Sequence, residues 1–351
     1  MPDEGRSSIN DRAGKELVSI IIPSFNSAKT ISACIVSIAE TNYASLEIIV
    51  VDDCSTDNSY SVVSDLSEKL SRSIKLIKQE INAGPASARN MGAKAANGKY
   101  LFFVDSDTMM KEDTINAFLF RIKDADAVVG VYDFLPLNEG YTQQYKALLN
   151  NYFFSRKGVI EYEVFDSSRA GIRADVFSSL KGFNETLQWG SDYENEEIGY
   201  RLSSKYRMLL DPNVIVRHHF PSFLQLTRTY FLRVSLWVEI FLKRRKFESG
   251  GVTSAETGLS SASLLASMIL FLLSIMLPIT LWKMIAMTGS FSLFIIYLYG
   301  YLGFFYFVLK RKASMLLPVI ILNLFFTTTI GLGALYGILR FLTGGSRTGD
   351  V

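Results

Sequence analysis

Cysteine and histidine are scarce in this chain, which has only two of each among 351 residues. Cys34 and Cys54 are too few for a disulfide framework or a cysteine-based zinc site, and two histidines cannot form a histidine-based metal cluster. A reducing compartment is therefore expected. An excess of one charge is also lacking, because 36 lysines and arginines balance 34 aspartates and glutamates. We accordingly expect no nucleic-acid partner.

Two nucleotide-binding motifs and a signal peptide are absent as well. No Gly-x-Gly-x-x-Gly follows the first predicted strand and no Gly-x-x-x-x-Gly-Lys-[Ser/Thr] occurs, which excludes a dinucleotide fingerprint and a P-loop. The first residues lack the basic, apolar and small-residue pattern of a signal peptide, so we expect the region up to about residue 246 not to be exported. Any nucleotide would need a different binding motif.

Long apolar runs, in contrast, are abundant at the C-terminal end. The chain is 49% hydrophobic and 20% charged, and the apolar excess is concentrated in residues 264–282, 291–309 and 315–339. Each run is long enough to cross a bilayer as a helix. Helices of a soluble core normally keep a polar face. We therefore predict three transmembrane helices within residues 263–342, and short tails at residues 1–16 and 343–351.

Basic residues are distributed unevenly around these runs. Residues 243–246 and 310–312 are basic clusters, whereas Lys283 stands alone between the first two runs. Such clusters stay on the cytoplasmic side of a membrane. The pattern predicts a multi-pass protein of the cell membrane with a cytoplasmic N-terminal region, an external turn near residues 287–290 and an external C-terminus.

An amphipathic stretch precedes the first apolar run. Apolar side chains recur there at three- and four-residue spacing, at Phe223, Leu226, Tyr230, Val234, Trp237, Val238 and Phe241. The spacing predicts a helix over residues 221–246 that lies among the headgroups of membrane lipid, with residues 247–262 as a linker. A helix packed on the globular region is the alternative.

The first half of the chain alternates between apolar runs and amphipathic segments. Strands are predicted at residues 17–22, 46–51, 74–78, 100–104 and 127–131, with a helix at 29–40 between the first two. Strands this apolar are typical of a parallel sheet covered on both faces. The fold class is therefore α/β, with a Rossmann-like, mostly parallel sheet. Ligands of such sheets bind beyond the carboxyl ends of the strands.

Polar side chains occupy those strand ends: Asn26 after the first, Asp52 and Asp53 after the second, Asn82 after the third, and Asp105 and Asp107 after the fourth. Carboxylates this close repel one another unless a cation is present, and a hard divalent ion is the simplest counterion. Residues 82–92 supply a nucleotide grip, with Gly84 for a tight turn, Pro85 at a first helical position and Arg89 about one turn later.

Four motifs in this order resemble the family 2 glycosyltransferases of GT-A fold: Ile22-Pro23-Ser24-Phe25-Asn26, Val51-Asp52-Asp53-x-Ser55-Thr56-Asp57, Asn82-x-Gly84-Pro85-Ala86-x-Ala88-Arg89-Asn90-x-Gly92 and Asp105-x-Asp107. The resemblance covers about residues 17–220, with 17–133 as the nucleotide-sugar half and 134–220 as the acceptor half.

This resemblance implies a role for each matching residue. Pro23 and Asp53 would hold the nucleotide base with Asp52 beside them, and Asn26 and Asn82 would belong to the same nucleotide-sugar site. Arg89 would lie near the ribose or diphosphate, Asp105 near the ribose and the metal, and Asp107 would bind a divalent cation, Mn²⁺ or Mg²⁺, directly. Inversion at the sugar carbon is the outcome that the family implies.

The acceptor half resembles the family in pieces. After Gly182-Phe183-Asn184-Glu185 comes the acidic run Asp192-Tyr193-Glu194-Asn195-Glu196-Glu197-Ile198, which aligns Asn195 with the family's base aspartate. An amide cannot accept a proton at neutral pH. Three explanations stay open: Asp192 or Glu194 is the base, the acceptor is an already ionised phosphate, or the chain is inactive.

One more residue carries over from the resemblance. In Val216-Arg217-His218-His219, His218 falls where the family often has a histidine that joins the metal, with His219 as the alternative.

These features predict an inverting, metal-dependent glycosyltransferase that moves one sugar from a nucleotide-sugar to a lipid-linked saccharide at the cytoplasmic membrane face. A polyprenyl phosphate acceptor and a catalytically degenerate subunit are the alternatives. A polymer-extruding synthase is disfavoured, because Thr229 replaces the tryptophan of the Gln-x-x-Arg-Trp signature. A haloacid-dehalogenase-like phosphohydrolase is also disfavoured, because Met109 stands where its motif needs threonine.

Overall fold

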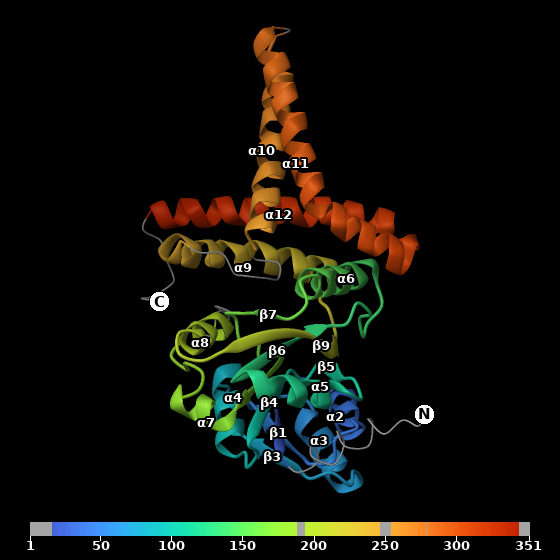
Figure 1. Cartoon of the computed structure of the whole chain (residues 1–351), viewed down its shortest axis with the longest axis vertical. Coiled ribbons are helices and arrows are strands. Elements are labelled where there is room, and N and C mark those ends of the chain that lie inside the picture. The colour runs from blue at the N-terminus through green and yellow to red at the C-terminus, as the bar shows by residue number, and fades with distance from the viewer. Residues whose placement is uncertain (1–15, 188–193, 246–253, 279, 344–351) are drawn as a thin grey trace, which may run out of the picture. The chain divides into compact units, whose positions relative to one another are not determined.

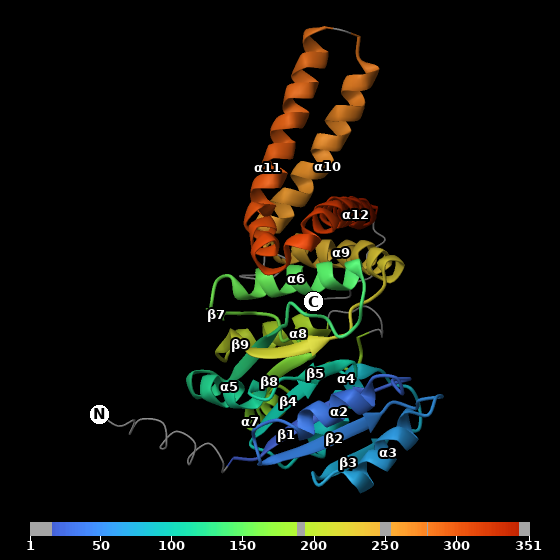
Figure 2. The same cartoon turned by 90° about the vertical axis from the view of Figure 1, so that its right-hand side faces the viewer.

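The computed structural model describes residues 16–187, 194–245, 254–278 and 280–343, and the chain divides into two compact units (Figures 1 and 2). Unit 1 consists of residues 1–137 and 154–219, and unit 2 of residues 138–153 and 220–351. Residues 138–153, which the sequence assigned to the acceptor half, thus group with the C-terminal helices. The predicted tails lie outside the described residues at 1–15 and 344–351, as does part of the predicted linker.

Unit 1 is built on one mixed sheet with the strand order β3-β2-β1-β4-β8-β6-β9-β5, and β7 pairs with β9. The strands are β1 (Val18–Ser24), β2 (Leu46–Asp52), β3 (Ile74–Lys78), β4 (Tyr100–Val104), β5 (Thr108–Met110), β6 (Ala127–Tyr132), β7 (Ile160–Glu161), β8 (Arg169–Arg173) and β9 (Met208–His218). All five predicted strands are present. Strands β1 to β4 are parallel neighbours, as predicted.

Beyond β4 the sheet is mixed rather than mostly parallel, although β6 and β9 are parallel neighbours. Strand β8 runs antiparallel to both β4 and β6, and β5 and β7 run antiparallel to β9. Parallel neighbours need a crossover that covers the sheet, usually a helix. After β6 the chain instead forms α6 (Tyr141–Ser155), which belongs mainly to unit 2, and then returns as β7 and β8.

Helices cover both faces of the parallel strands. The alternating residues Ile20 and Ile22 of β1 pack with Ile35 of α2 (Ile31–Ala39), in one core that also contains residues of α3 (Ser59–Lys69). On the other face, Val51 of β2 packs with Ala88 of α4 (Pro85–Lys94). The remaining elements of unit 1 are α5 (Thr114–Arg121), η1 (Ile122–Asp124), α7 (Ala174–Ser179) and α8 (Glu194–Ser203).

Two glycines fix the position of α4. Gly84 precedes the helix with φ +88°, a conformation that L side chains rarely adopt. Gly92 lies so close to the sheet that a Cβ atom there would be 2.6 Å from the Cγ2 atom of Ile21. Both glycines of the motif at residues 82–92 are therefore required by the backbone or by close packing. They hold α4 so that Arg89 lies near Asp105, which follows β4.

Unit 2 is helical. Besides α6 it contains α9 (Phe223–Arg244), α10 (Ala255–Met276), α11 (Leu281–Lys312), η3 (Ala313–Met315) and α12 (Leu316–Leu342). Helices α10 and α11 form a long hairpin, while α12 runs alongside α9 and crosswise to the hairpin (Figures 1 and 2). The contact between α9 and α12 is close, because Cβ atoms at Gly333 and Gly337 would lie 2.6 and 2.4 Å from the carbonyl oxygens of Phe231 and Ser235.

A helix is present where the amphipathic stretch at residues 221–246 predicts one, as α9 (Phe223–Arg244). A capping box formed by Ser222 and Gln225 begins the helix. Gln225 thus caps the N-terminus of α9, and Arg228 follows about one turn later.

The predicted boundaries of the apolar helices are wrong in two places. Helix α10 begins at Ala255, inside the predicted linker, and ends at Met276, while α11 continues through residues 287–290, where a turn was expected. The helix break instead precedes Pro278, because a residue before proline is pushed out of the helical region. Leu277 indeed has the extended conformation φ −79°, ψ 143°.

The number of membrane spans is not confirmed either. By length and composition, the described residues contain two candidate spans, Ala255–Met276 and Leu281–Leu342, the second of which joins α11 and α12. Since α12 runs crosswise to the hairpin (Figure 1), the structure does not have three apolar helices side by side.

Candidate functional site

The first two strand ends are joined by the side chain of Asn26. This residue has φ +49°, and its Oδ1 atom accepts hydrogen bonds from the backbone N–H groups of Thr56 and Asp57 at 2.9 and 3.3 Å. Pro23 lies beside Val51 in the β1–β2 register and is half-buried. Asn26 therefore has a local structural role at the place where the sequence predicts a nucleotide contact.

The two aspartates after β2 differ in their partners. Asp53 is 3% exposed, and its two carboxylate oxygens each accept a backbone N–H at 2.8 Å, from Ala83 and from Gly84. Asp52 is 1% exposed; one oxygen accepts the N–H of Ser55 at 3.2 Å, but its Oδ1 atom has no hydrogen-bond partner among the described residues. Because a buried polar oxygen is normally satisfied, Asp52 is the better placed of the two to accept a ligand's N–H or O–H group.

Arg89 brings two predicted site residues together. Its guanidinium lies 2.9 Å from Asp105 and 3.4 Å from Glu194, and its side chain is only 6% exposed. The guanidinium also lies over the ring of Phe183, 5.6 Å from the centroid. The structure thus joins Arg89 of α4, Asp105 after β4 and Glu194 at the start of α8. Asn82, by contrast, is exposed on the loop before α4.

The second pair of aspartates meets a histidine from β9. One ligand atom each from Asp105, Asp107 and His218 lie within 4.8 Å of one another. The antiparallel register of β5 and β9, which pairs Thr108 with His218, brings them together, and the backbone N–H of His219 donates to the carbonyl of Asp107 at 3.1 Å. Metal–oxygen bonds of about 2.1–2.6 Å span twice that length across an ion, so the three donors fit one divalent cation.

Electrostatics at this cluster favour the ionised form of Asp107. Burial alone would raise the pKa of its carboxyl group. The neighbouring His218 Nε2 atom, 3.3 Å from Asp107 Oδ1, and the charge of His219 outweigh burial, so the pKa of Asp107 lies below its usual value. An ionised carboxylate is the form that binds a cation.

The predicted base region has no carboxylate at its centre. The Oδ1 atom of Asn195 accepts hydrogen bonds from the Oγ and N–H groups of Ser167, at 2.8 and 3.3 Å. Glu194 faces Arg89, and Glu197 forms a two-contact ion pair with Arg201 at 2.6 and 2.7 Å. Asp192, the other candidate base, lies outside the described residues.

Sequence reasoning missed a polar network beside the candidate metal ligands Asp105, Asp107 and His218. The Tyr132 ring lies 4.8 Å from the ring of His218, and its hydroxyl bonds the Ser168 hydroxyl at 2.6 Å. Ser168 donates to Asp166 at 2.6 Å, and Asp166 forms an ion pair of 2.5 Å with Arg169, which is 1% exposed. The rule used for the other strands would have found Tyr132, because it directly follows the predicted strand 127–131.

Comparison with known proteins agrees with this arrangement. Residues 19–180 match the family described as Glycosyl transferase family 2. The chain is 39% identical over 119 residues to glycosyltransferase GlyG of Streptococcus pneumoniae, which covers 33% of this chain and 39% of GlyG. It is 45% identical over 91 residues to the UDP-Glc:alpha-D-GlcNAc-diphosphoundecaprenol beta-1,3-glucosyltransferase WfgD of Escherichia coli, which covers 26% of this chain and 35% of WfgD. The chain thus spans well under half the length of these relatives.

A solved structure is similar over most of the chain. The mannosyltransferase PcManGT from Pyrobaculum calidifontis, in complex with GDP-Man and Mn²⁺, superimposes with a TM-score of 0.55 at 18% identity, over 93% of this chain and 87% of PcManGT. At this identity the similarity concerns the fold. The chain therefore matches glycosyl transferase family 2 over residues 19–180 and has a GT-A-like α/β fold.

Proposed function

We propose that this protein is an inverting, metal-dependent glycosyltransferase that moves one sugar from a nucleotide-sugar to a lipid-linked saccharide at the cytoplasmic face of the cell membrane. The observation that carries the proposal is the convergence of Asp105, Asp107 and His218 beside Arg89, at the carboxyl end of β4. Ligands of doubly wound sheets bind at this edge.

The donor nucleotide would lie over the ends of β1 and β2. The buried, unpartnered Oδ1 atom of Asp52 is available to accept a hydrogen bond from a base or ribose. Asp53 would act by holding the loop before α4, since both of its oxygens accept N–H groups of that loop. Pro23, Asn26 and Asn82 would complete the walls of this site, and the cation of Arg89 would face the diphosphate.

Asp107, Asp105 and His218 would hold the divalent cation. Two carboxylates and one imidazole suit Mn²⁺ better than Mg²⁺, which prefers oxygen donors alone. When bound, such an ion stabilises the negative charge that develops on a nucleoside diphosphate as the sugar bond breaks. Attack by the acceptor oxygen on the opposite face of the sugar then inverts its configuration.

The acceptor is inferred from one relative and from the apolar helices. The name of WfgD specifies a sugar linked to diphosphoundecaprenol, which supports a lipid-linked saccharide, and the two candidate spans support a site near the membrane. Asn195 favours a second candidate, a polyprenyl phosphate acceptor, because an ionised phosphate needs no base and the side-chain Oδ1 atom of Asn195 already accepts a hydrogen bond from Ser167. A degenerate, inactive subunit is the third reading.

A donor panel tests the proposal. The purified full chain is incubated with several UDP- and GDP-sugars and lipid-linked saccharide, with Mn²⁺, Mg²⁺ or chelator, and nucleotide release is measured. We expect release that chelator abolishes and that Asp107→Asn lowers by about 100-fold or more. The control Asp65→Asn changes an exposed aspartate of α3 and should release nucleotide normally. Full release by Asp107→Asn, or by the unchanged chain in excess chelator, would contradict the metal assignment.

A further inference from the structure

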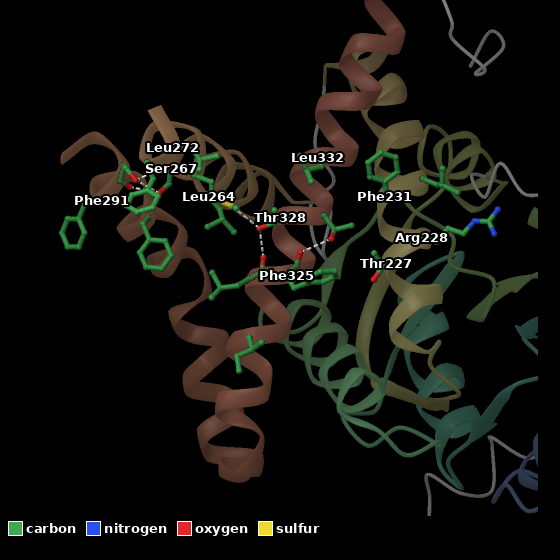
Figure 3. Close-up of a pocket in the computed structure, with 18 of the residues that line it drawn as sticks. Thr227, Arg228, Phe231, Leu264, Ser267, Leu272, Phe291, Phe325, Thr328 and Leu332 are labelled. Atoms are coloured by element: carbon green, nitrogen blue, oxygen red, sulfur yellow. Dashed lines mark hydrogen bonds between the residues drawn. The ribbon is translucent and has the colours of Figure 1, made fainter. Parts of the chain in front are cut away.

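Unit 2 contains a large apolar groove between α9, α10, α11 and α12 (Figure 3). Its volume is about 1460 Å³. The wall is built mainly from leucine and phenylalanine side chains of all four helices, among them Phe231, Leu264, Leu272, Phe291, Phe325 and Leu332. The groove therefore lies where the α10–α11 hairpin meets the two helices that run crosswise to it.

The hydroxyl groups of the groove are already satisfied within the wall. Ser267 and Ser290 each donate a hydroxyl hydrogen bond to the other's carbonyl oxygen, at 2.8 and 2.9 Å. The hydroxyls of Thr227 and Thr328 donate to carbonyl oxygens of their own helices at 2.8 Å. Because these hydroxyl hydrogens point to backbone oxygens, the groove offers little to a polar ligand and suits a hydrocarbon chain.

Arg228 is the single charged side chain among the described residues that line the groove. It is exposed, and it makes no ion pair or hydrogen bond with any described residue. In Figure 3 its guanidinium points away from the apolar side chains. A ligand that filled the groove with an apolar chain would thus meet a free cation at one end, which is the complement of an amphiphile with an anionic head.

We propose that this groove binds the isoprenoid chain of a polyprenyl-phosphate or polyprenyl-diphosphate acceptor, and that Arg228 contacts the phosphate. The inference rests on the proposed function, because that transfer requires an acceptor on such a lipid. It assigns the lipid to residues between Leu224 and Leu332, outside the range 19–180 that matches family 2. It holds whether the phosphate itself or a saccharide attached to it accepts the sugar. A two-chain phospholipid is the competing occupant.

Photocrosslinking of the full chain in nanodiscs of phosphatidylethanolamine and phosphatidylglycerol tests the assignment. The probe is a polyprenyl phosphate with a diazirine on its isoprenoid chain, and the labelled residues are identified by mass spectrometry. We expect labels on groove residues such as Phe325 and Leu332, and competition by unlabelled polyprenyl phosphate at far lower concentration than by added phosphatidylglycerol.

Two variants with matched controls test the phosphate contact and the isoprenoid contact separately. Arg228→Gln should weaken the probe's apparent affinity about five- to tenfold, whereas Lys283→Gln removes a cation of α11 outside the groove and should not. Leu332→Trp fills the groove and should lower the labelling yield, whereas Leu302→Trp enlarges an exposed leucine outside it. Size-exclusion profiles and unfolding midpoints verify that each variant is folded.

The outcomes separate the groove from the proposed function. Equal competition by phosphatidylglycerol, labelling outside the groove, or full affinity of Arg228→Gln would overturn the assignment even if sugar transfer is observed. Groove labelling with the expected variant effects, in a chain that releases no nucleotide from any donor, would support the lipid site and contradict the transferase.

Discussion

Asn195→Asp tests what the acceptor is, and its consequences follow from the contacts of this residue. In the structure Asn195 Oδ1 accepts two hydrogen bonds from Ser167. An aspartate at position 195 keeps an Oδ1 atom for both Ser167 hydrogen bonds, and its second oxygen replaces the amide nitrogen of asparagine. The variant therefore adds a carboxylate at the centre of the predicted base region without removing either of these hydrogen bonds.

The effect on stability should be small. Charge on the acceptor strengthens each Ser167 hydrogen bond from about 1 to about 1.5–3 kcal/mol, and the first turn of α8 favours a negative charge by about 0.3–1 kcal/mol. Repulsion from Glu194 and Glu196, which flank position 195 in the sequence, and desolvation oppose these gains. We expect a net change in the free energy of unfolding within about 1 kcal/mol.

The effect on rate should be much larger if the acceptor is a hydroxyl group. A positioned base contributes about 10²- to 10⁴-fold, which corresponds to about 2.7–5.4 kcal/mol of activation free energy. We therefore expect Asn195→Asp to raise the initial rate of nucleotide release with a lipid-linked saccharide by at least about 100-fold. Adding Ser167→Ala should remove part of this gain, because the carboxylate loses one of the groups that orient it.

The assay compares Asn195→Asp with Asn116→Asp, which adds the same charge in the first turn of α5. Rates are measured at saturating donor and Mn²⁺, with a lipid-linked saccharide and with polyprenyl phosphate in parallel. An unchanged rate for Asn195→Asp, together with robust transfer to polyprenyl phosphate by the unchanged chain, would refute the hydroxyl acceptor. A clear loss of thermal stability would refute the interpretation of the Ser167 contacts.

Three further predictions concern the stability of the two units and the orientation of the α10–α11 hairpin. Arg169→Met should lower the free energy of unfolding by about 3 kcal/mol, because it leaves the Asp166 carboxylate without its buried partner; thermal unfolding in detergent measures the loss, and adding Asp166→Asn should recover part of it. Gly337→Leu should cost about 2 kcal/mol in the same assay, because its Cβ atom would lie 2.4 Å from the Ser235 oxygen. Thr280→Cys, in a background without the native cysteines, should react with an impermeant maleimide only from outside the cell, because it lies at the turn between α10 and α11; labelling from the cytoplasmic side alone would reverse the orientation.

The parallel half of the sheet could be predicted from the sequence because its strands are uninterrupted apolar runs. The other strands carry no such signal. Strands β5 and β7 have three and two residues, and β8 begins with a buried arginine whose charge is balanced by Asp166. Strand β9 contains Asp211-Pro212-Asn213, which by composition indicates a turn. Their pairing depends on partners far away in the sequence.

The apolar helices show a related difference between composition and geometry. Hydropathy located the apolar runs but left Lys283 between two of them, although it lies in the first turn of α11. A single proline decides where the helix breaks, and its effect on residue 277 is conformational and does not alter the local hydropathy. The direction of α12 depends on Gly333 and Gly337, which allow close packing on α9. No window average contains that information.

The choice between His218 and His219 depends on strand register. His218 is the last residue of β9, and His219 follows the strand. A shift of one residue in the pairing of β5 with β9 would place His219 opposite Thr108 instead. The pairing of Thr108 with His218 fixes the register, and the short strand β5 exists only because β9 is there to pair with it. Local sequence therefore narrows the candidate third ligand of the proposed metal site to this pair of histidines, and the long-range pairing of residues 108–110 with 216–218 brings His218 close to Asp105 and Asp107.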